Sequence, residues 1–91
     1  MNFITKDSDE ALPFDVDDVT ITVSKHFERT WMRKWGWHYL DVAEAIRDSY
    51  QVSRAGRAKW EVYFRKKGDK KLVISYDEEG GEVHVITGAE G

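Results

Sequence analysis

The 91-residue chain contains no cysteine, a single proline and no long apolar run. Without cysteine the protein can form neither a disulfide framework nor a catalytic thiolate. No segment approaches the roughly 20 apolar residues of a membrane-spanning helix, and no secretory signal opens the sequence. We therefore expect a cytoplasmic protein with no membrane partner.

Recognisable cofactor motifs are also missing from the sequence. The three histidines are not at metal-ligand spacing, and the chain has neither a glycine-rich phosphate loop nor a Gly-x-Ser-x-Gly elbow. We predict no metal and no nucleotide cofactor.

Charge is unevenly distributed along the chain, although the net charge is only −3. Residues 1–18 hold six acidic residues and one lysine, and the last fifteen residues hold five acidic residues and no Lys or Arg. Residues 24–76 hold thirteen Lys and Arg against six Asp and Glu, a local charge of +7. Such a basic middle is compatible with a polyanion partner. The alternative is that these side chains simply cover a solvated surface.

The length predicts one domain preceded by an arm. Residues 1–16 are acidic and have no clean hydrophobic period, which predicts a loosely ordered arm with Leu12 and Phe14 as possible points of attachment. Residues 17–91 are expected to form a single domain. It opens with a strand, because β-branched apolar residues alternate with threonines over residues 19–23.

Residues 25–37 predict an amphipathic helix that organises the rest of the chain. Ser24 is a suitable N-cap, and Gly36 is the usual type of residue just past a helix end. At about 100° per residue, one face is aromatic and the opposite face is basic. The aromatic face holds Phe27, Trp31 and Trp35 with Met32 beside them, and the basic face holds His26, Arg29 and Arg33.

A second helix and four strands are expected after Gly36. The second helix has a narrow apolar stripe formed by Val42, Ala45 and Ile46. From residue 50 the hydrophobic period becomes two, and short turns, most of them containing glycine, separate the apolar runs, which predicts an antiparallel meander. The fold class is therefore α+β, with a helix hairpin on one face of a twisted antiparallel sheet in the order β-α-α-β-β-β-β. Within this fold we expect burial of Trp31, Ile46, Val62 and Ile74, and a mainly structural role for Trp31, Trp35, Trp37 and Trp60.

This pattern resembles the small uncharacterised prokaryotic domains placed near the BrnT- and RelE-like toxin group. The resemblance covers roughly residues 24–88 and is carried by His26, Arg29, Arg33, Gly36, Asp41-Val42-Ala43-Glu44-Ala45-Ile46 and Val85-Ile86-Thr87. It implies a RelE-like fold together with RNA cleavage or RNA binding. Some such domains act only with a partner antitoxin.

Two histidines and several cations are candidates for an RNA-directed site. Metal-independent RNA cleavage needs a base, an acid and cations for the phosphate, and histidine can serve either proton role. His26 and His84 are the candidate catalytic residues, and the candidate phosphate-binding residues are Arg29, Arg33, Lys59 and Lys71. The alternatives are a solvated helix face paired with Glu28 or Asp41, and a surface histidine at position 84.

A second basic cluster lies on one predicted hairpin and consists of Lys59, Arg65, Lys66, Lys67, Lys70 and Lys71. It could grip a phosphate backbone, or it could keep a hairpin turn soluble. Two function classes stay open, with enzymatic activity undecided. One is an RNA-directed module of the RelE-like ribonuclease kind, and the other is a non-enzymatic domain that binds a protein through a sheet edge or the helix pair.

Overall fold

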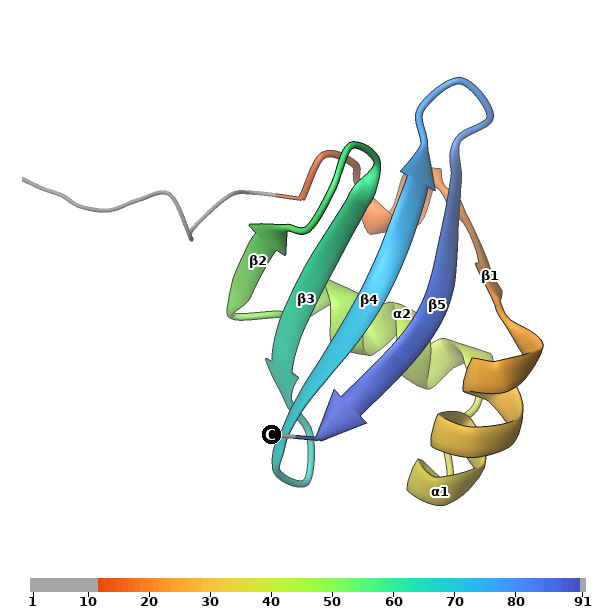
Figure 1. The fold of residues 1–91 in the computed structure, drawn as a ribbon, viewed down its shortest axis with the longest axis vertical. Helices are drawn as coiled ribbons and strands as arrows, with labels where there is room; N and C mark the ends of the chain where they lie inside the picture. The colour runs from red at the N-terminus through yellow and green to blue at the C-terminus, as the bar shows by residue number, and fades with distance from the viewer. Residues whose placement is uncertain (1–11, 91) are drawn as a thin grey trace, which may run out of the picture.

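The computed structural model describes residues 12–90, which form an α+β fold (Figure 1). Its elements are η2 (Val16–Asp18), β1 (Thr20–Val23), η3 (Phe27–Met32), α1 (Arg33–Trp35), α2 (Tyr39–Arg47), β2 (Gln51–Arg54), β3 (Lys59–Arg65), β4 (Asp69–Asp77) and β5 (Glu82–Glu90). Residues 25 and 26, η3 and α1 are continuous and are called the first helix. The predicted α+β class and the order of strands and helices are confirmed.

The five strands form one sheet in the order β1-β5-β4-β3-β2. Strands β2 to β5 pair antiparallel, as the meander predicts. β1 instead pairs parallel to β5, with Thr20 opposite Glu82 and Val23 opposite Val85. The sheet is therefore mixed, and the prediction of an antiparallel sheet is wrong for β1. Its direction is set by the helical crossing between β1 and β2, which the local alternation of apolar residues does not encode.

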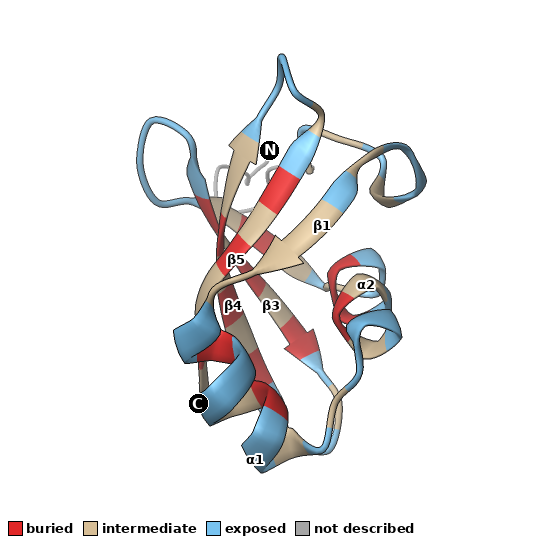
Figure 2. Cartoon of the chain, turned by 90° about the vertical axis from the view of Figure 1, so that its right-hand side faces the viewer, coloured by how far each residue is buried: buried red, intermediate tan, exposed pale blue. Residues whose placement is uncertain are grey.

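The two helices cover one face of the sheet and one of its sides. α2 lies behind the strands in Figure 1, and the first helix lies beside β5, beyond the end of β1 (Figure 2). No helix among residues 12–90 covers the opposite face, which is turned to the viewer in Figure 1 and is called the open face below.

Hydrogen bonds fix both ends of the first helix. The Ser24 hydroxyl accepts a hydrogen bond from the Phe27 N–H at 2.9 Å and donates one to the Ile86 carbonyl at 2.7 Å, so the N-cap also ties the helix to β5. At the other end Gly36 adopts a left-handed conformation with φ of 69°. The Gly36 and Trp37 N–H groups bond back to the carbonyls of Arg33 and Met32, the pattern of a Schellman motif.

The first helix is wider than an α-helix in its middle. Residues Phe27–Met32 have the i→i+5 hydrogen bonding of a π-helix. Phe27 and Met32, which are five residues apart, are buried, whereas Trp31 and Trp35 are only half-buried. The prediction that Trp31 is buried is therefore wrong, because the wider turn rotates every position after Phe27 relative to α-helical spacing.

The core lies between α2, the first helix and the inner face of the sheet. Ile46, Val62 and Ile74 are fully buried, which confirms three of the four burial predictions. α2 also buries Val42 and Ala45, as its apolar stripe predicts. The remaining buried apolar side chains are Phe27, Met32, Val52, Trp60, Phe64, Leu72, Val83 and Val85.

An aromatic cluster holds the first helix on the sheet. Trp35 lies 4.8 Å from Trp37, 5.3 Å from Trp31 and 6.1 Å from Phe27 between ring centroids. Beneath it is Gly88 of β5, where a Cβ would lie only 2.9 Å from the Trp35 ring and 3.1 Å from the Phe27 ring. The helix can therefore approach β5 this closely only because residue 88 has no side chain.

The described part of the expected arm packs on the domain. Leu12, Phe14 and Val16 are partly buried against the core, and the Phe14 ring lies 4.9 Å from that of Tyr76. The other residues of the arm predicted over 1–16, residues 1–11, lie outside the described residues.

We predict that Phe27→Ala lowers the free energy of unfolding by about 3–5 kcal/mol, because it leaves a cavity in the core. Trp31→Ala should cost clearly less, since the Trp31 ring stays half in water in the folded protein. Urea unfolding followed by circular dichroism measures both values. An equal or larger loss for Trp31→Ala would contradict the assigned face of the helix.

Candidate basic site on the first helix

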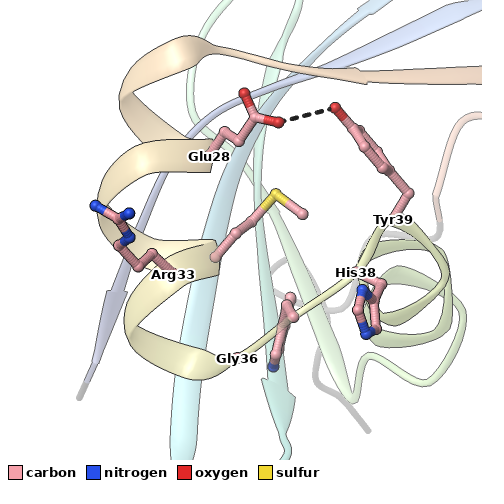
Figure 3. Close-up of a pocket in the computed structure, with 7 residues that line it drawn as sticks. Glu28, Arg33, Gly36, His38 and Tyr39 are labelled. Atoms are coloured by element: carbon pink, nitrogen blue, oxygen red, sulfur yellow. Dashed lines mark hydrogen bonds between the residues drawn. The ribbon is translucent and has the colours of Figure 1, made fainter.

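The basic face of the first helix is directed to solvent. His26, Arg29 and Arg33 are all exposed. Among residues 12–90, none of these three side chains makes a hydrogen bond or an ion pair. In Figure 3 the guanidinium of Arg33 points away from Tyr39 on α2. The structure thus brings these three predicted site residues together on one helix, as their spacing predicts.

The two carboxylates considered as partners for this face are engaged elsewhere. Glu28 accepts a hydrogen bond of 3.2 Å from the Tyr39 hydroxyl (Figure 3). The pKa of the Tyr39 hydroxyl is raised, mainly by the negative charge of Glu28 and secondly by this hydrogen bond. Asp41 accepts the His38 N–H at 2.8 Å and lies 3.6 Å from the Lys66 ammonium. The His38 N–H bond is the main reason why the pKa of Asp41 is lowered.

A groove of about 490 Å³ separates the first helix from the start of α2 (Figure 3). It is lined by Glu28, Met32, Arg33, Gly36, Trp37, His38 and Tyr39. The next residue, Leu40, is 83 % exposed, which is unusual for leucine in a small domain. The lining of the groove thus combines the apolar side chains of Met32 and Trp37 with the carboxylate of Glu28 and the guanidinium of Arg33.

Half of the six cations on the basic hairpin of β3 and β4 are paired with carboxylates. Each of three cations has a carboxylate within ion-pair distance; the pairs are Arg65 with Asp69, Lys66 with Glu44 and Asp41, and Lys71 with Glu61. Lys71 was a candidate phosphate-binding residue, and its ammonium lies 3.5 Å from Glu61. The hairpin is therefore a weaker polyanion site than its composition indicates.

Lys70 is buried, with only 7 % of its surface exposed, and has a structural role. Its ammonium donates hydrogen bonds to the carbonyls of Lys66 and Lys67 at 2.6 and 2.7 Å. These bonds satisfy two backbone carbonyls of the turn at residues 66–68, where Lys67 and Gly68 both have positive φ. Asp69 and Lys70 are the first two residues of β4.

Lys59 and His84 lie on the open face, away from the first helix's basic stripe. Ser75 of β4 is opposite Lys59 on one side and opposite His84 on the other, so the three positions form one row across the sheet. Lys59 is exposed and makes no side-chain hydrogen bond or ion pair within residues 12–90. The two candidate phosphate-binding lysines therefore differ. Lys59 has no ion-pair partner within residues 12–90, whereas Lys71 is paired with Glu61.

His84 contacts Thr22, which in turn contacts Glu82, and the sequence indicated neither residue as part of a site. The Nδ1 atom of His84 lies 2.8 Å from the Thr22 hydroxyl, and this hydroxyl donates to Glu82 at 3.1 Å. No hydrogen bond among the described residues joins His84 to His26. Because side chains alternate along a strand, Glu82 and His84 lie on the same side of β5. Thr22 lies beside them only because β1 pairs parallel to β5.

Comparison of the chain with protein-family models, with curated proteins and with solved structures found no match. Within residues 12–90, no helix is long and apolar enough to cross a membrane. The same residues contain no group of three or more His, Asp or Glu side chains that could hold a metal ion.

We predict that Asp41→Asn destabilises the protein at neutral pH and that the difference from the wild type shrinks in acid. A carboxyl whose pKa is lowered by folding stabilises the native state while ionised, and this contribution is lost as the pH falls through the folded pKa, below the ordinary value of 3.8. Unfolding free energies between pH 7 and pH 2 measure the effect.

Asp48→Asn, at the end of the same helix, is the control, because Asp48 makes no side-chain hydrogen bond among residues 12–90. A gap for Asp41→Asn that stays constant down to pH 2 would show that the His38 cap does not depend on the carboxylate charge.

Proposed function

We propose that this protein binds RNA through the basic face of its first helix. The observation that carries the proposal is the availability of His26, Arg29 and Arg33, which are exposed and unpaired within residues 12–90. Exposed guanidiniums without carboxylate partners are suited to bidentate contacts with phosphate. Three of the six cations of the neighbouring hairpin are paired with carboxylates and Lys70 is buried, so the helix is the favoured contact surface.

The spacing of the charges fits an extended polyanion better than a single small anion. Arg29 and Arg33 are four residues apart, close to one turn of the first helix, so their side chains leave it in successive turns. His26 extends the stripe toward the N-terminus, where the helix dipole also favours negative charge. Such a row can contact successive phosphates of one strand, and contacts of this kind depend little on base sequence.

The groove beside the helix is a less suitable path for the phosphates. Glu28 lines it and holds the Tyr39 hydroxyl, so a strand lying there would meet a carboxylate. We therefore place the RNA on the outer side of the helix. We propose binding rather than cleavage, because no contact among residues 12–90 unites His26 and His84 at one ribose.

A protein-binding function is the second candidate, and the exposure of Leu40 favours it. Leu40 is 83 % exposed and follows the half-exposed Tyr39, which lines the groove together with Met32 and Trp37. Apolar side chains in this position are typical of surfaces that receive a partner segment. An antitoxin-like partner would belong to this class.

We predict that Arg33→Ala weakens binding to a short mixed-sequence single-stranded RNA by roughly 5–10-fold at 0.1 M salt. The slope of log affinity against log salt should fall by about one, because one phosphate contact is lost. Arg29→Ala should behave in the same way. Fluorescence anisotropy at several salt concentrations gives both quantities.

Arg65→Ala is the matched control, since it removes the same charge from a guanidinium already paired with Asp69. Equal losses for Arg33→Ala and Arg65→Ala would mean that net charge, not the helix face, determines affinity. NMR shifts confined to residues outside the first helix, or no shifts at millimolar RNA, would end the proposal that this helix face binds RNA and leave the protein-binding one.

A further inference from the structure

The Thr22 hydroxyl lies between two side chains of β5. Its oxygen is 2.8 Å from His84 Nδ1 and 3.1 Å from a carboxylate oxygen of Glu82. The parallel pairing puts Thr22 directly opposite His84 and Thr20 opposite Glu82. Both contacts join residues about sixty positions apart, so the tertiary fold alone creates this group.

The two contacts together determine which nitrogen of His84 carries the proton. A threonine hydroxyl has one hydrogen, and an ionised carboxylate can only accept. The Thr22 hydrogen therefore goes to Glu82, and His84 must donate to the Thr22 oxygen through Nδ1–H. This assignment follows from counting protons, since the hydrogens themselves are not observed. It leaves the neutral ring with a free lone pair on Nε2, for which residues 12–90 supply no partner.

The neighbours of His84 on the open face can complete a small polar site. Ser75 lies opposite His84 on β4, and Lys59 lies opposite Ser75 on β3. The row therefore offers an acceptor at Nε2, a hydroxyl and an unpaired ammonium. A ligand hydroxyl can donate to Nε2 while its oxygen accepts from Ser75 or Lys59. A phosphate oxygen has no hydrogen to give and would also meet the charge of Glu82.

We propose that His84, held by Thr22 and Glu82, binds the 2′-hydroxyl of a ribose and makes the protein prefer RNA to DNA. The 2′-hydroxyl is the group that distinguishes the two nucleic acids and is both a donor and an acceptor. The inference rests on the proposed RNA binding, and the structure joins the two surfaces through β5. Ser24 at the start of the basic helix bonds to Ile86, two residues beyond His84.

Thr22→Val tests the positioning role, because it removes the hydroxyl and keeps a β-branched side chain in the strand. Wild-type protein should bind a short RNA about 3- to 10-fold more tightly than the DNA of the same sequence, the value of one well-placed hydrogen bond. RNA methylated at the 2′-oxygen should bind like DNA, since it has lost the donor. Thr22→Val should abolish the preference by weakening RNA binding alone.

Thr20→Val is the matched control on the same strand and face, since Thr20 makes no side-chain hydrogen bond within residues 12–90. It should preserve the preference for RNA. Arg33→Ala should weaken RNA and DNA by the same factor. Nitrogen-15 NMR of the imidazole in the free protein should show the Nδ1–H form in the wild type and in Thr20→Val.

The failures of the two proposals can be told apart. Equal affinity of the wild type for RNA, methylated RNA and DNA would overturn the ribose site while nucleic-acid binding stands. An Nε2–H tautomer, or an unchanged preference in Thr22→Val, would overturn the role of Thr22. Absence of binding to every oligonucleotide would overturn the proposed function and the ribose site with it.

Discussion

The close contact between the first helix and β5 is the constraint on which the rest of the structure depends. Gly88 makes it possible, because any Cβ there would collide with the rings of Phe27 and Trp35. Ser24 fixes the start of the helix by linking the Phe27 N–H to the Ile86 carbonyl. Held in this way, the helix packs its aromatic side on the sheet and leaves its basic side in water.

The pattern of ion pairs decides which cations are available to a ligand. One described acidic residue near each end of the chain pairs with a basic residue of the middle, with Asp17 bound to Arg47 and Glu90 bound to Lys34. Exposed pairs of this kind contribute little to stability. Their consequence here is a change in the charge surface, because they offset two carboxylates near the ends of the described residues, whereas His26, Arg29 and Arg33 have no such partner within residues 12–90.

The open face gains its chemistry from the direction of β1. Only parallel pairing with β5 places the Thr22 hydroxyl between Glu82 and His84. Because the one hydrogen of the Thr22 hydroxyl is directed to Glu82, His84 donates to the Thr22 oxygen through Nδ1–H, which fixes the imidazole tautomer. The basic helix and this polar row adjoin the same strand, so one nucleic acid could contact both by crossing β5.

Short-range patterns in the sequence determined the elements of this protein. Ser24 and Gly36 mark the ends of the first helix, and alternation marks the strands, because caps, turns and hydrophobic periods act over a few residues. Only the tertiary structure decided the wide turn that half-exposes Trp31, the direction of β1 and the separate settings of His26 and His84. The tertiary structure alone also decided that Lys71 is paired with Glu61 and that Arg33 has no carboxylate partner within residues 12–90. These features depend on which distant segments meet when the core closes, and no local pattern specifies that.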